Sequence, residues 1–208
     1  MEGKTCRRSC GWSVARFFDA GKGLLIFAFF MIFTLQGLSV AALNTSDEKA
    51  KYAEYKVKAA YLYNFAKFVD WPEEILADPS LPLSICIIGE DPFGNALDTI
   101  KGKTVKGRKL LIKRYSGVED LKECHIIFIS PSEKENLAGI LEKIKDMHML
   151  TVSDMEGFSN RGGMITLKKV KNKIRLEVNL DAAQQSGLKV SSKLLKIATI
   201  IKGQEPER

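Results

Sequence analysis

Histidine and cysteine, the residues that most often hold transition metals, are scarce in this sequence. Of the 208 residues, two are histidine and four are cysteine. His125 and His148 have no histidine, cysteine or carboxylate at metal-ligand spacing, and Cys86 and Cys124 belong to no Cys-x-x-Cys pair. The sequence therefore predicts no metal site.

The sequence signatures of common enzymes are missing as well. It contains no Gly-x-Ser-x-Gly nucleophile turn and no dinucleotide-binding fingerprint. The carboxylate pairs Glu73-Glu74 and Glu119-Asp120 fall in polar stretches and are typical of solvated charge. Catalytic groups can assemble in space, so an enzyme is not excluded, but the absences favour a binding protein without catalytic residues or cofactor.

No dense basic run interleaved with aromatic residues occurs, although the formal net charge is +7. Five of the 32 basic residues and two of the 25 acidic residues precede residue 43, so the remainder carries a net charge of +4. A charge this mild does not indicate nucleic acid as a partner.

The N-terminus has the order of a secretory signal. A basic segment precedes the short apolar run Leu24–Leu35, Gln36-Gly37 interrupts that run, and small residues suited to a peptidase follow. We expect residues 1–42 to be a cleaved signal peptide. The alternative is an uncleaved anchor, because Leu24–Leu43 has the roughly 20 residues that a membrane span needs. In both cases the basic flank places residues after 43 across the membrane.

We predict a helix that begins near Glu48 and ends before Trp71-Pro72. Within the stretch Lys58–Pro72 this helix has an unusually wide apolar surface. One apolar face carries Tyr55, Ala59, Leu62, Ala66 and Val69. Such faces usually belong to a core, but aromatic residues beside it can also serve a partner protein. The candidate partner-binding residues are Tyr61, Phe65, Phe68 and Trp71.

Continuous apolar runs such as Ser84–Gly89 and His125–Ser130 are typical of strands buried on both faces of a parallel sheet. The segments Met164–Val170 and Asn172–Leu180 alternate instead and predict an antiparallel hairpin. We expect Ser191–Ile201 to be a helix. The pattern predicts one α/β domain over residues 43–208, with three layers and a mixed, mostly parallel sheet closed by the C-terminal hairpin and helix.

A turn after the first of these strands could receive an anion. The turn has two glycines five residues apart before a helix predicted from Asp91 to Ile100, but it lacks the lysine of a phosphate-binding loop. A plain strand-to-helix turn explains the same pattern. The residues of this candidate ligand site are Gly89, Asp91, Gly94 and Asn95.

Cys86 and Cys124 both lie in apolar, strand-like runs. On the far side of the membrane from the cytoplasm, where we expect these residues to lie, a disulfide between the two cysteines would persist. Two buried free thiols fit the sequence equally well, because cysteines on neighbouring strands often have poor bridging geometry.

Four stretches, at residues 58–74, 85–97, 125–130 and 162–198, follow one another in this order after the signal segment. Together they resemble the YfiR-like periplasmic proteins, and the similarity runs from about Tyr55 to Ile201. The helix ending in Trp-Pro and the segment Asn179–Ser192 are the most specific parts.

The resemblance implies a secreted α/β domain without known catalysis that represses an inner-membrane signalling protein, either a diguanylate cyclase or a sensor kinase. It further implies an outer-membrane lipoprotein that can sequester the domain, and a homodimer. The family's disulfide chemistry uses two cysteine pairs. Cys86 and Cys124 match one pair, and Met149–Gly163 offers no counterpart of the other. The alternative function is a periplasmic receptor for a small, nucleotide-like ligand.

Overall fold

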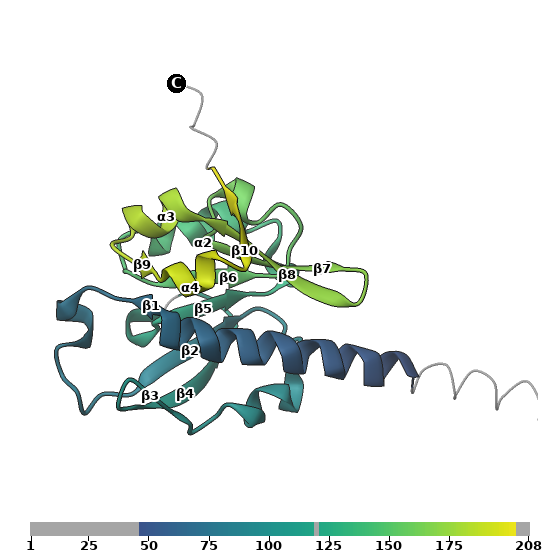
Figure 1. The fold of residues 1–208 in the computed structure, drawn as a ribbon, viewed down its shortest axis with the longest axis horizontal. Helices are drawn as coiled ribbons and strands as arrows, with labels where there is room; N and C mark the ends of the chain where they lie inside the picture. The colour runs from purple at the N-terminus through teal and green to yellow at the C-terminus, as the bar shows by residue number, and fades with distance from the viewer. Residues whose placement is uncertain (1–45, 119–120, 203–208) are drawn as a thin grey trace, which may run out of the picture. The chain divides into compact units, whose positions relative to one another are not determined.

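The long helix predicted around Lys58–Pro72 covers residues 46–68 and lies along one face of a β-sheet (Figure 1). This computed structural model describes residues 46–118 and 121–202. The predicted signal at 1–42 and the pair Glu119-Asp120 lie outside the described residues. Within the described part, no helix is both long and apolar enough to cross a membrane.

The sheet has eight strands in the order β10-β8-β7-β6-β5-β2-β4-β3. The strands from β4 through β7 pair in parallel, whereas β3–β4 and β7–β8 are antiparallel, which confirms the predicted mixed, mostly parallel sheet. The bounds are β2 Leu83–Ile88, β3 Thr104–Val105, β4 Arg108–Tyr115, β5 Ile126–Ile129, β6 Leu150–Ser153, β7 Ile165–Val170, β8 Lys173–Asn179 and β10 Ala198–Ile201.

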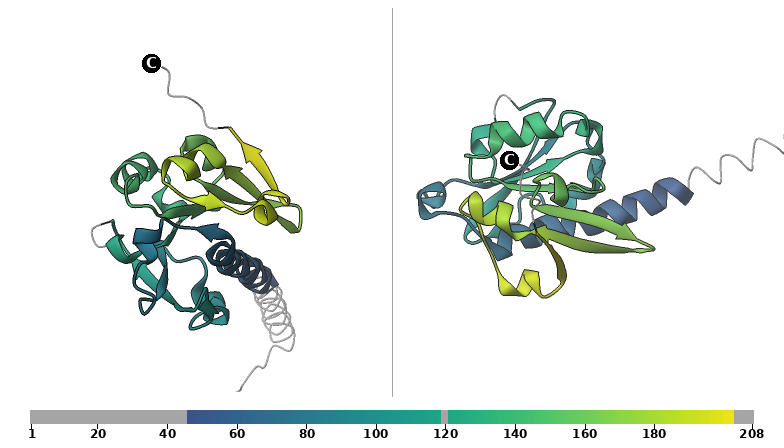
Figure 2. Two further views of the ribbon diagram at one scale, coloured as in Figure 1. Left: turned by 60° about the vertical axis from the view of Figure 1, so that its left-hand side comes forward. Right: turned by 90° about the horizontal axis from the view of Figure 1, so that it is seen from above.

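Two apolar layers sandwich the central strands, because successive side chains of a strand point to opposite faces. Ile85 and Ile87 of β2 join the layer under the long helix, whereas Cys86 and Ile88 join the layer under α2, Leu137–Ile144. Figure 2 shows the long helix and α2 on opposite sides of the sheet. The fold is therefore the three-layer α/β arrangement that the buried strands predicted.

The predicted hairpin is present as β7 and β8. Lys171, in the turn between them, has a φ of 54°. The prediction of one helix over Ser191–Ile201 is wrong. Only α4, Ser192–Leu195, is helical, and β10 follows it and pairs in parallel with β8. The last apolar residues therefore extend the sheet instead of covering it.

The remaining elements are short. The helix predicted from Asp91 is a 3-10 helix, η2 Gly94–Thr99, and α2 begins at Leu137. The hydroxyl of Ser132 accepts a hydrogen bond from the Glu90 amide, 3.0 Å away, so it does not cap a helix. The other bounds are β1 Val69–Asp70, η1 Glu73–Leu76, η3 Leu121–Glu123, η4 Pro131–Glu133, η5 Ser159–Arg161, α3 Leu180–Gln185 and β9 Lys189–Val190.

Candidate functional site

An open groove of about 640 Å³ separates the first half of the long helix from the β7–β8 hairpin, and the two run alongside each other in Figures 1 and 2. The helix contributes Ala50, Ala53, Val57 and Tyr61 to its lining. These residues are three or four positions apart, so they share one face of the helix. That face differs from the core face, and Val57 is 47% exposed on it. The helix thus carries a second apolar stripe that no described residue covers completely.

The hairpin forms the other wall of this groove and is strongly basic. Five of the eight residues from Lys168 to Arg175 are lysine or arginine, and none is acidic. Ile174, half-buried, adds apolar surface to this wall, and Lys173 and Arg175 line the groove beside it. The groove therefore combines apolar surface with positive charge along one side.

A chain of ion pairs holds the helix against the hairpin. One carboxylate oxygen of Glu54 lies 2.7 Å from the Lys169 ammonium, and the other lies 2.5 Å from that of Lys58. Burial raises the pKa of Glu54, but hydrogen bonds from Lys169 and Lys58 outweigh it and hold the pKa below its usual value. Glu54 is therefore an acceptor for both cations at neutral pH, and it fixes one wall of the groove to the other.

The same chain continues into the interior. The Lys58 ammonium lies 2.6 Å from Oδ2 of Asp154, in the loop after β6, and the hydroxyl of Tyr55 donates to the same oxygen at 2.8 Å. Burial and the neighbouring Asp154 charge raise the pKa of the Tyr55 phenol. The carboxyl ends of parallel strands are where α/β domains often bind ligands. Here Lys58 and Asp154 are almost completely buried, so their geometry serves to anchor the helix.

The four predicted partner-binding aromatics divide into two kinds. Phe65 is 0% exposed and Trp71 is 6% exposed, so both belong to the core. Trp71 packs edge-on against the ring of His125, with ring centroids 6.1 Å apart. Tyr61 and Phe68 are half-buried. Tyr61 alone of the four lines the groove.

The predicted ligand turn brings its residues together around an ion pair. Nε of Arg114 donates to Asp91 at 2.6 Å, and the same guanidinium donates to the Gly94 carbonyl. The Asp91 carboxylate also accepts from the Phe93 amide. An anion at this turn would have to compete with Asp91 for Arg114, while exposed Asn95 would remain available.

Gly89 is packed too closely for any side chain. Its φ is +83°, and an added Cβ would lie 2.4 Å from Oγ of Ser132. Gly89 therefore allows two loops to approach each other closely, which is a structural role. The spacing of the glycines in the sequence does not distinguish this role from ligand binding.

Cys86 and Cys124 form a disulfide in the structure, with Cα atoms 5.9 Å apart. Both residues are buried in the apolar layer under α2. The bond links β2 to Cys124, which lies two residues before β5, the parallel neighbour of β2, on the face of the sheet opposite the long helix.

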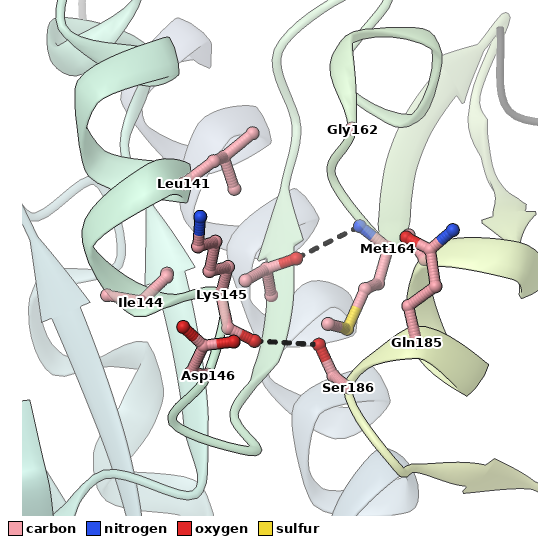
Figure 3. A pocket seen from close by; sticks show the side chains of 10 residues that line it. Leu141, Ile144, Lys145, Asp146, Gly162, Met164, Gln185 and Ser186 are labelled. Atoms are coloured by element: carbon pink, nitrogen blue, oxygen red, sulfur yellow. Dashed lines mark hydrogen bonds between the residues drawn. The ribbon is translucent and has the colours of Figure 1, made fainter. Parts of the chain in front are cut away.

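A smaller cavity of about 240 Å³ lies between α2 and α3 (Figure 3). Two of the hydroxyl groups that line it already bond within the protein. The Thr151 hydroxyl accepts from the Met164 amide at 2.9 Å, and the Ser186 hydroxyl lies 3.5 Å from the carbonyl oxygen of Lys145. In the described part of the chain, histidine, cysteine and carboxylate side chains form no group of three that could hold a metal ion.

The groove was not identified from the sequence. Ala50 and Ala53 lie in the polar first part of the helix, where two alanines do not stand out. Two features of the sequence could have indicated the groove: the regular spacing from Ala50 through Val57 to Tyr61, and the density of cations in the hairpin. The net charge of the whole chain does not reveal this local cluster of cations.

Two comparisons with known proteins bear on this chain. The family model described as YfiR/HmsC-like matches residues 55–199. A crystal structure of a conserved domain protein from Vibrio cholerae O1 biovar El Tor superimposes with a TM-score of 0.42 at 15% sequence identity. That superposition covers 62% of this chain and 57% of the other, and at this TM-score it carries no functional implication.

Proposed function

The chain belongs to the YfiR/HmsC-like family, and from this premise we propose that it is a non-catalytic periplasmic regulatory protein. It binds the periplasmic part of an inner-membrane signalling protein and represses its output. A diguanylate cyclase is the first candidate for that protein and a sensor kinase the second. The observation that carries the proposal is the family match, which spans most of the chain.

The groove between the long helix and the hairpin supports a binding role. Its apolar stripe includes Val57, which is nearly half exposed, and Tyr61, which is half-buried. Exposed apolar surface beside a rigid wall is typical of a docking site for another protein. The wall is rigid here because Glu54 bridges the two elements that form it.

The test is a cross-linked pull-down of the tagged full-length protein from intact cells, combined with measurement of cellular cyclic di-GMP. We expect an inner-membrane cyclase or kinase with a periplasmic segment to be captured. Deletion of the gene should raise the output of the captured protein, and re-expression should restore repression. Recovery of the bait alone, with unchanged output after deletion, would reject the proposal.

A further inference from the structure

We propose that the groove between residues 50–61 and the β7–β8 hairpin receives an amphipathic helix of the partner, with an apolar face and acidic flanking residues. This inference rests on the proposed regulatory function and specifies the chemistry of the partner at that site. Three properties of the groove lead to it: its length, its apolar stripe and its uncompensated charge.

The apolar stripe has the dimensions of a helix contact. From Ala50 to Tyr61 the long helix rises roughly 16 Å, about three turns, at 1.5 Å per residue. Ala50 and Ala53 are small and exposed, so a second helix can approach the backbone closely there, while Val57 offers a larger contact. A helix docked in this way places its own residues at spacings of three and four against the stripe.

Among the described residues, ion pairs neutralise only part of the charge on the hairpin wall. Lys169 pairs with Glu54, and Lys168 pairs with Glu177 at 3.0 Å. In the described residues, Lys171, Lys173 and Arg175 form no ion pair. An acidic flank on the docked helix would compensate these cations, whereas a basic helix would be repelled.

The shape of the site favours a helix over a lipid surface. Anionic phospholipid would also attract the basic hairpin, and Val170 at its tip is 42% exposed. A bilayer is flat on this scale, however, and would leave the groove that Ala53 and Val57 line unfilled. A protein segment fills the groove and meets the cations at once.

The experiment uses a photo-reactive benzoylphenylalanine in place of Val57 in the full-length protein, expressed in its own cells. A second version carries the probe at Lys109, an exposed residue of β4 that lies outside the groove. Mass spectrometry identifies the cross-linked segment.

Charge reversal by Lys173→Glu with Arg175→Glu is compared with the control pair Lys101→Glu with Lys109→Glu. The control pair changes the net charge by the same amount, on exposed residues outside the groove.

We expect the probe at position 57, and not at 109, to label a partner segment with apolar residues at helical spacing and a net negative charge. The Lys173→Glu/Arg175→Glu variant should lower that yield roughly tenfold, the size expected for two reversed charge contacts, and the control pair should leave it unchanged.

Three results would overturn the inference while leaving the proposed function intact: capture of the regulated protein without labelling from position 57, a labelled segment that is neutral or basic, or labelling of phospholipid. Failure to capture any signalling protein by either probe or by the pull-down would instead count against the proposed function itself.

Discussion

The ammonium group of Lys58 lies 2.6 Å from Oδ2 of Asp154, which is 96 residues further along the chain, and both side chains are buried. This pair fastens the long helix to the carboxyl end of β6. Lys58 also pairs with Glu54, and Glu54 pairs with Lys169 of the hairpin, so the buried pair is continuous with the ion pairs that join the two walls of the groove.

Replacing Asp154 by asparagine should destabilise the fold, because Lys58 would keep only Glu54 as a counter-ion. Breaking a buried ion pair from one side costs about 3–5 kcal/mol, and the remaining contact puts this variant at the lower end. Urea unfolding measures the loss. The double variant Lys58→Met/Asp154→Leu removes both charges and should recover much of it. A single variant as stable as wild type would show that the pair contributes nothing.

Phe65→Ala and Tyr61→Ala should affect different properties. Phe65 is fully buried, so its truncation should cost about 3–5 kcal/mol of unfolding free energy. Tyr61 lines the groove, and Tyr61→Ala should weaken capture of the partner while costing much less stability. The pull-down and urea unfolding are run on both variants. Equal partner capture by wild type and Tyr61→Ala would remove Tyr61 from the docking surface.

Stability should fall with acidification through His125. Burial, and then the nearby Arg108 cation, hold the His125 pKa below its usual 6.5, and the ring nitrogen accepts a hydrogen bond from the Ser84 amide. The unfolded chain therefore binds the proton first. The His125 contribution is fully present above about pH 6.5 and is lost as the pH falls from there through the lowered value.

The measurement is the slope of unfolding free energy against pH between about 7 and 5, which a single proton limits to about 1.4 kcal/mol per pH unit. His125→Gln should flatten this slope, even if the loss of packing on Trp71 lowers stability at every pH. An unchanged slope would show that His125 is not the titrating group.

The Cys86–Cys124 disulfide should stabilise the domain, since the two cysteines are 38 residues apart. Closing a loop of that length is worth about 2–4 kcal/mol. Cys86→Ala/Cys124→Ala should lose that amount relative to the oxidised protein, and dithiothreitol should have no further effect on the double variant. Alkylation without reductant, read by mass spectrometry, should leave both cysteines unmodified, and two alkylated thiols would contradict the bond.

The local sequence was sufficient to predict those elements whose structure is decided by neighbouring residues along the chain. Ile85–Ile88 and Ile126–Ile129 are apolar throughout, and such runs suit strands covered on both faces. Lys171 with Asn172 fits the tight turn of the hairpin. The long helix followed from its apolar spacing, and Trp71-Pro72 indicated its end.

Distant contacts decided the rest. Ile197–Ile201 is a short apolar run whose periodicity does not separate helix from strand, and only its pairing with β8 makes it β10. Nothing near Lys58 in the sequence indicates that Asp154 receives its charge. Phe65 and Tyr61 have similar local patterns, and only the packed structure shows which one is covered.

The β1–β9 ladder joins Val69 to Val190, and the Ser191 amide donates to the Phe68 carbonyl at 2.9 Å. The end of the long helix is thus held by residues that lie more than a hundred positions further along the chain and are synthesised later. On the ribosome, most of the domain must emerge before this closure can form, and contacts of such sequence separation slow folding. A chain interrupted before residue 189 would lack β9 and β10, leaving apolar surface open to proteases and to other chains.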